Sequence, residues 1–321
     1  MGAEKILFTP VLMHFAARHI GKSYGEFASD YRVLAEANLR CMEFFHTDMA
    51  WLISDPYRET SALGAGIEFI PEGVPRCLNN IVHSIQDVRK LEIPDVYHAE
   101  RTSDRLKAAE TISSTLGGKK SLIGWVEGQL AEACDLAGLD TMLLQLLTDP
   151  EFSDELLDKC TAMAKTFAEA QIRAGCDIIG VGDAICSQID LQLYEQYVEN
   201  RHRELFDFIH DLGGIVKLHI CGDITHLLSS IAREGADIVD LDWQVDMKAA
   251  HQILGKDCIL CGNINPLNVM RNSAMEVEQE CTNLIKKMQG IPFILSAGCE
   301  IPVSTPPENL LAMHFARLKS Y

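Results

Sequence analysis

The segment Leu218–Gly222 (LHICG) places an imidazole and a thiol two residues apart. Side chains two apart in a β-strand point the same way, so His219 and Cys221 would share one face, and Gly222 would let the chain turn away directly after them. Zinc favours imidazole nitrogen and thiolate sulfur, and a catalytic zinc keeps three protein ligands and one open position. Cys299, which ends another apolar segment, could complete such a site.

Chance pairing is the alternative to this interpretation. A chain of 321 residues with 11 histidines and 11 cysteines holds roughly 0.4 His-x-Cys pairs at random, and a buried cysteine usually only packs. Cys258 and Cys261 have the CxxC spacing of many metal sites, but residues three apart in a strand face opposite sides. We therefore do not expect that pair to bind metal.

Carboxylates stand at the ends of other apolar segments. Glu127, Asp183 and Asp242 are candidates to orient a substrate or to move a proton. Asp183 follows the sequence Gly-Val-Gly, whose glycines would let a ligand approach the backbone. Asp242 could reach the metal or orient a ligand, but Asp240 shares its side of the strand, and the sequence does not choose between them. Helix capping or a salt bridge is the alternative role for these acids.

Five further residues are candidates for substrate binding, namely Asp55, Asn263, Trp125, Phe8 and Met13. The apolar residues among them could form a pocket for an aromatic or methyl-bearing ligand. Core packing is the alternative for Phe8, Met13 and Trp125. For Asp55 the alternative is a turn, because a proline follows it directly.

Eight short apolar segments alternate with amphipathic stretches of helical periodicity. The segments are Ile6–Leu12, Met49–Ser54, Ser121–Glu127, Asp177–Asp183, Gly214–Cys221, Ile238–Trp243, Cys258–Ile264 and Phe293–Cys299. Continuous apolar runs are typical of buried parallel strands, and the alternation of strands with helices indicates βαβ units. Eight such units predict an α/β fold with a single (β/α)8 TIM barrel, and an open doubly wound sheet is the alternative.

A barrel would bring the candidate residues together, because the carboxyl ends of its strands converge on one face. Barrel active sites lie on that face, and the candidate metal ligands and acids follow those strand ends. We expect residues 1–321 to form one domain, with an inserted hairpin near residues 67–77, after the second strand.

The composition narrows the partners and the compartment. The formal net charge is −18, and binding to nucleic acid or to an anionic membrane needs a basic face, so we expect neither partner. The 11 cysteines are odd in number and lie mostly inside apolar segments, unlike a secreted disulfide framework. The sequence has no signal-peptide pattern and no apolar stretch long enough to span a bilayer, so we expect a cytoplasmic protein.

From about Lys5 to Tyr321 the chain resembles the uroporphyrinogen decarboxylase superfamily, whose members have a single (β/α)8 barrel. The segments that carry the resemblance are Ile53–Asp55, Gly124–Gly128 (GWVEG), Gly180–Asp183, His219–Gly222, Leu241–Trp243, Gly262–Pro266 and, most specifically, Ser296–Asn309 (SAGCEIPVSTPPEN).

Within this superfamily the chain resembles the corrinoid-dependent methyltransferase branch more than the decarboxylases. Decarboxylases carry an arginine-rich motif of the form RQAGR that binds substrate carboxylates, and the matching segment Leu12–Arg18 (LMHFAAR) lacks it. They also carry a histidine where this chain has Ala297–Cys299 (AGC). Methylcobamide:coenzyme M methyltransferases use His-x-Cys and a distant cysteine as zinc ligands. The resemblance therefore implies Zn²⁺ on His219, Cys221 and Cys299.

The resemblance also implies methyl transfer between a small molecule and the cobalt of a corrinoid carried on a separate protein. Two chemistries are open: zinc activates a thiol that accepts the methyl group, as in coenzyme M-type enzymes, or it polarises the oxygen of a methyl ether that donates it. We favour O-demethylation of a methoxylated aromatic, because apolar residues follow the first strand. A tetrapyrrole decarboxylase and a non-catalytic ligand- or corrinoid-binding barrel remain as alternatives.

Overall fold

A computed structural model describes residues 6–319 of the chain. Eight strands form one sheet in the order β1-β10-β9-β8-β7-β6-β5-β2, and each pair of neighbours in it is parallel. The strands are β1 (Leu7–Phe8), β2 (Met49–Trp51), β5 (Ser121–Glu127), β6 (Ile178–Gly182), β7 (Ile215–His219), β8 (Ile238–Leu241), β9 (Ile259–Ile264) and β10 (Phe293–Ala297). Each lies within one of the eight apolar segments, so the predicted (β/α)8 barrel is confirmed.

The barrel closes between β1 and β2 through side chains as well as backbone. The backbone N–H of Asp48 donates to the Phe8 carbonyl at 2.8 Å, and the Asp48 carboxylate accepts from the Phe8 N–H at 2.8 Å. Inside the barrel, Trp51 Nε1 donates to Thr9 Oγ1 at 2.9 Å. Strand β1 is shorter than the predicted segment because Pro10 follows Thr9 and has no N–H to continue the ladder.

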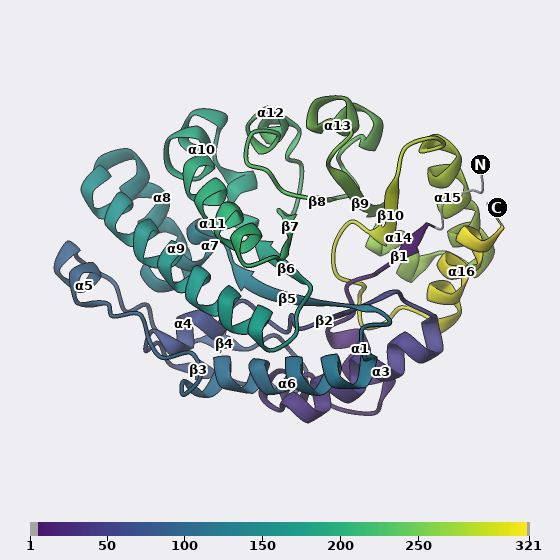
Figure 1. Cartoon of the computed structure of the whole chain (residues 1–321), viewed down its shortest axis with the longest axis horizontal. Coiled ribbons are helices and arrows are strands. Elements are labelled where there is room, and N and C mark those ends of the chain that lie inside the picture. The colour runs from purple at the N-terminus through teal and green to yellow at the C-terminus, as the bar shows by residue number, and fades with distance from the viewer. Residues whose placement is uncertain (1–5, 320–321) are drawn as a thin grey trace.

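Helices surround the sheet in chain order, as the colours of Figure 1 show. They are α1 (His14–His19), α2 (Tyr24–Ser29), α3 (Tyr31–Phe45), α4 (Arg58–Ala62), α5 (Ile85–Lys90), α6 (Glu100–Leu116), α7 (Gln129–Ala137), α8 (Leu139–Thr148), α9 (Pro150–Arg173), η1 (Ala184–Gln188), α10 (Leu191–Tyr197), α11 (Glu199–Asp211), η2 (Thr225–Leu227), α12 (Leu228–Ile231), α13 (Met247–Leu254), α14 (Pro266–Arg271), α15 (Ala274–Lys287) and α16 (Pro307–Leu318). No helix within residues 6–319 is long and apolar enough to cross a membrane.

Successive side chains of each strand point to opposite faces of the sheet, so the strands separate two hydrophobic cores. Trp51, Ile123, Trp125 and Ile178 belong to a core that fills the barrel, and the intervening residues belong to a larger core beneath the helices. Between α4 and α5 the chain forms an antiparallel hairpin of β3 (Ile67–Glu68) and β4 (Arg76–Cys77).

A buried polar cluster ties α7 and α11 to the end of β6. Asp183 is fully buried, and its carboxylate accepts from the backbone N–H groups of Leu130 and Ala131, so it caps α7. His202 Nε2 lies 3.3 Å from the same carboxylate, and His202 Nδ1 lies 3.1 Å from that of Glu234. Burial lowers the pKa of His202, but the two carboxylates outweigh burial and raise this pKa to about 9.

We predict that His202→Gln removes a pH-dependent part of the stability. Below about pH 6.5 histidine is charged in both the folded and the unfolded chain, so the contribution of the charged cluster is complete. It is lost as the pH rises towards about 9, the pKa in the folded protein, and it amounts to roughly 3 kcal/mol in total. Urea unfolding of both proteins across this range measures the effect, and identical pH dependence would contradict the assignment.

Candidate metal centre

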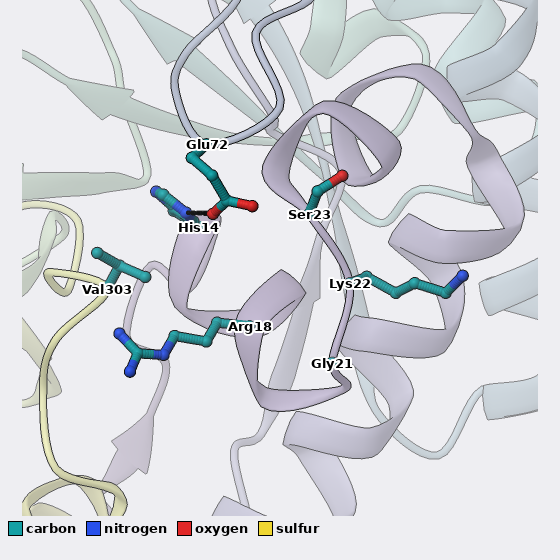
Figure 2. Close-up of a pocket in the computed structure, with 7 residues that line it drawn as sticks. All are labelled: His14, Arg18, Gly21, Lys22, Ser23, Glu72 and Val303. Carbon is teal, nitrogen blue, oxygen red and sulfur yellow. Dashed lines mark ion pairs between the residues drawn. The ribbon is translucent and has the colours of Figure 1, made fainter.

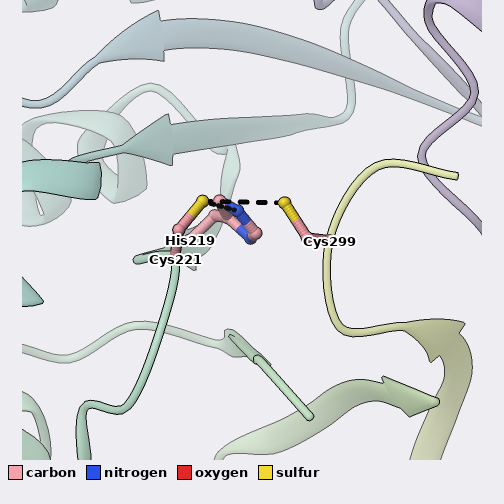
Figure 3. Close-up of side chains that lie close together, drawn as sticks. All are labelled: His219, Cys221 and Cys299. Atoms are coloured by element: carbon pink, nitrogen blue, oxygen red, sulfur yellow. Dashed lines mark hydrogen bonds between the residues drawn. The ribbon is translucent and has the colours of Figure 1, made fainter. Parts of the chain in front are cut away.

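His219, Cys221 and Cys299 come together at the mouth of the barrel. His219 is the last residue of β7, Cys221 lies two residues further on, and Cys299 lies two residues beyond β10. The Nε2 atom of His219 is 3.1 Å from the Cys221 sulfur, which is 3.7 Å from the Cys299 sulfur. Figure 3 shows the two sulfur atoms pointing towards one another from opposite segments.

The three side chains fit a metal ion by donor type and by spacing. One ligand atom from each lies within 4.8 Å of the others. Within residues 6–319, this is the group of histidine, cysteine and acidic side chains that meets this spacing. One imidazole and two sulfurs form a donor set that zinc prefers, and three ligands leave one coordination position open.

Proton sharing couples the two thiols. The hydrogen bond from Cys221, together with His219, lowers the pKa of Cys299 to about 4, while the contact with Cys299 raises the pKa of Cys221. These shifts favour a thiolate on Cys299 and a thiol on Cys221. A bound cation would displace that remaining proton, because metals bind cysteine as thiolate.

The indole ring of Trp125 lies between the candidate metal centre and Glu127. Its ring centroid lies 6.0 Å from that of His219, and its Nε1 donates to Glu127 Oε1 at 2.8 Å. A Cβ atom on Gly180 or Gly182 would overlap the indole ring, so these glycines provide the space that the ring occupies. Their role is close packing against a side chain.

Glu127 stands level with His219 on the inner face of the barrel. Glu127 pairs with Gly182, and Gly182 pairs with His219, so roughly 10 Å of sheet separates their backbones, and the Trp125 ring occupies the space over Gly182. Burial, and then the carboxylate of Glu59, raise the pKa of Glu127 well above its ordinary value, against the opposing charge of Arg58. This upward shift of the pKa favours the protonated, neutral form of Glu127.

Asp242 braces the loop that carries Cys221, and Asn263 braces the segment that follows Asp242. The Asp242 carboxylate accepts from the N–H of Gly222 at 2.8 Å and from its neighbour Trp243 at 2.7 Å. The Asn263 amide donates to the carbonyls of Asp242 and Val245. These contacts support positioning roles, and a direct role in proton transfer or substrate binding stays a prediction.

Three other predicted site residues do not line the mouth. Phe8 lies on the outer face of β1, where its ring packs against His314, because its neighbours in the strand face inward. Asp183 is buried as the cap of α7, as described above. Asp55 forms a buried bidentate ion pair with Arg101 at 2.8 and 2.7 Å. In the sequence, an acid that caps a helix or forms an ion pair, or an aromatic residue that packs in the core, looks the same as a site residue.

A pocket of about 490 Å³ lies next to α1. His14, Arg18 and Glu72 contribute to its lining, and Figure 2 shows the His14 ring facing the Glu72 carboxylate. The backbone N–H of His14 donates to Glu300, the residue after Cys299, which connects the pocket to the centre. Met13 precedes α1 and is half-buried, so it remains a candidate for contact with a ligand.

Lys217 and Arg58 are buried charges near the centre that sequence reasoning missed. Lys217 occupies the inner face of β7, and its Nζ donates to the Asp240 carboxylate. Arg58 begins α4, and its guanidinium lies 3.4 Å from the Glu127 carboxylate. The sequence offers one signal for these buried charges, which is the presence of a lysine within the apolar run Ile215–His219.

Fold and site together define a (β/α)8 barrel with one imidazole and two thiols at the carboxyl ends of its strands. The chain belongs to the uroporphyrinogen decarboxylase family, because residues 3–319 match the family described as Uroporphyrinogen decarboxylase (URO-D).

The relatives of this chain carry the names of two activities. A uroporphyrinogen decarboxylase of Trichlorobacter lovleyi is 27% identical, and the match covers 94% of this chain and 91% of the relative. The methylcobamide:CoM methyltransferase MtbA of Methanosarcina acetivorans is 28% identical over 74% of this chain and 70% of the relative. A solved methyltransferase from Methanosarcina mazei superposes with a TM-score of 0.90 at 21% identity, covering 99% of this chain and 94% of that one, and so shares the fold.

We predict that Gly182→Ala displaces Trp125, because the added methyl group would overlap the indole. Overpacking of this kind costs about 1–3 kcal/mol of unfolding free energy. Urea unfolding, together with tryptophan emission, measures the change. Gly73→Ala is the control, because its new methyl group would meet a flexible Ile70 side chain on the hairpin, and equal losses in the two variants would contradict the packing role of Gly182.

Proposed function

We propose that this protein is a zinc-dependent methyltransferase that moves a methyl group between a small substrate and the cobalt of a separate corrinoid protein. The observation that carries the proposal is the convergence of His219, Cys221 and Cys299 at the barrel mouth. These residues would hold the ion, which supplies a Lewis acid with an open position for the heteroatom that carries or receives the methyl group.

The site favours this activity over tetrapyrrole decarboxylation. The two relatives named above are 27% and 28% identical to this chain, so identity alone does not separate the two activities. Cys299 stands where the resemblance places a histidine in decarboxylases, and here its sulfur lies 3.7 Å from that of Cys221. The arginine-rich motif for substrate carboxylates is missing from Leu12–Arg18.

Within this activity the direction we favour is demethylation of a methyl ether, with a methoxylated aromatic as donor. Removal of the methyl group leaves an alkoxide or phenoxide that must be stabilised or protonated. Glu127 lies on the same level of the barrel as His219, and its raised pKa favours the protonated form, so it is our candidate for the proton donor. Trp125, whose ring lies between them, would pack against an aromatic donor.

Two alternatives share the metal centre. A thiol substrate of the coenzyme M type would bind as thiolate and accept the methyl group, and it would need no proton donor. A non-catalytic barrel would bind zinc and a ligand without exchanging methyl groups. A requirement for Glu127 as proton donor distinguishes the methyl-ether hypothesis from the thiol and the non-catalytic alternatives.

We predict that the purified protein binds one zinc ion and that Cys221→Ser and Cys299→Ser each lose it, because a catalytic zinc site depends on each of its few ligands. Metal analysis after dialysis gives the stoichiometry. Cys258→Ser is the matched control, since Cys258 also lies partly exposed but outside the cluster. A folded wild-type protein without affinity for zinc would overturn the proposed function.

We further predict that Glu127→Gln retains zinc but lowers demethylation by about 100-fold or more, because glutamine fills the same space and cannot release a proton. The assay follows conversion of cob(I)alamin to methylcobalamin by its absorption, with methoxylated aromatics as donors. Methyl transfer from methylcobalamin to a thiol should change little in this variant. Unchanged demethylation by Glu127→Gln would exclude Glu127 as the proton donor.

A further inference from the structure

Lys217 is a charged residue in the packed interior of the barrel. Its side chain has no exposed surface, and it points inward from β7 towards Trp51, whose ring centroid lies 5.3 Å from Nζ. A buried ammonium group without a partner is strongly destabilising, so such a residue needs a compensating charge. The zinc ligands alone do not explain why the chain places a lysine here.

Asp240 provides that compensating charge. It stands on the neighbouring strand β8, and its Oδ1 accepts from Lys217 Nζ. Its second oxygen, Oδ2, faces His219 Nδ1 across 3.4 Å. Both atoms are buried, and neither has a hydrogen-bond partner within residues 6–319, so their approach to 3.4 Å pairs two polar atoms that otherwise lack one.

The orientation of the imidazole makes this contact informative. His219 directs Nε2 towards the Cys221 sulfur at 3.1 Å and therefore directs Nδ1 towards Asp240. A neutral imidazole carries its proton on one nitrogen and a lone pair on the other. An acceptor beside Nδ1 favours the tautomer with the proton there, which leaves the lone pair on Nε2, among the sulfur atoms.

We propose that the Lys217–Asp240 pair positions His219 as a metal ligand through Nε2. This inference rests on the proposed function, since it assigns a role towards the same zinc. Asp240 fixes the tautomer and the ring orientation, as carboxylates beside metal-bound histidines do. Lys217 holds one Asp240 oxygen, so the other is presented to His219, and the pair adds no net charge beside the metal.

Asp240→Asn tests the proposal because the two neighbours compete for one oxygen. The ammonium of Lys217 has only donors, so it retains the amide oxygen and turns the amide NH₂ group towards His219 Nδ1. The acceptor for His219 is thereby lost with little change in shape. We expect zinc affinity, measured by competition with a chelator, to fall about 10- to 100-fold.

A second substitution distinguishes positioning from simple stability. In Asp240→Asn/Lys217→Met the amide is free to turn its oxygen to His219, so zinc affinity should recover at least 5-fold over Asp240→Asn, by roughly the weight of one hydrogen bond. Asp240→Leu/Lys217→Met, which has no acceptor, should not recover. This double-variant comparison remains valid if Asp240→Asn alone folds poorly, because neither double variant contains the buried ammonium group.

The matched control is Asp237→Asn. Asp237 pairs with His210 Nε2 at 2.8 Å just before β8, at the opposite end of the barrel from the metal centre. We expect its zinc affinity to equal that of the wild type. The absorption spectrum of the Co²⁺-loaded proteins gives a second readout, and only substitutions at Asp240 and Lys217 should alter its ligand-field bands.

Each outcome has one meaning. Wild-type protein that binds no zinc would overturn the proposed function itself. Wild-type protein that binds zinc, with equal affinity in Asp240→Asn, would overturn the positioning role alone. Equal affinity in the Asn and Leu double variants would likewise overturn it, because the acceptor would then make no difference.

Discussion

The register of the parallel strands is the constraint on which the site depends. Glu127 pairs with Gly182, Gly182 with His219, and His219 with Asp240, so four neighbouring strands present these residues at one level. A slip of one residue in any strand would turn its side chain to the outer face. Backbone hydrogen bonds therefore set the positions of the acid, the imidazole and the carboxylate before any side chain contributes.

Loops then add the two sulfurs to this frame. Cys221 and Cys299 lie just beyond their strands, and the Asp242 carboxylate holds the first loop through the Gly222 N–H. A side chain on Gly298 would meet the Asp242 region, so this glycine allows the second loop to approach. Asp242, a candidate catalytic residue in the sequence, thus also holds a loop in place.

The sequence predicts well the strands and the convergence of His219, Cys221 and Cys299, because both depend on local patterns. Continuous apolar segments mark buried strands, and His219 and Cys221 share a face through simple alternation. The packing of Phe8 in the outer core and the ion pair of Asp55 with Arg101 were not predicted, because both contacts depend on distant segments. The Lys217–Asp240 contact escaped prediction for the same reason, since two separate strands supply it.

The central claim is that His219, Cys221 and Cys299 bind a catalytic zinc with one open position. X-ray absorption at the zinc edge tests it most directly. The account predicts two sulfur neighbours at about 2.3 Å, one imidazole nitrogen and one further light atom. The number of sulfur neighbours should stay at two when a methoxylated aromatic is added. A zinc ion surrounded by nitrogen and oxygen alone would contradict the account.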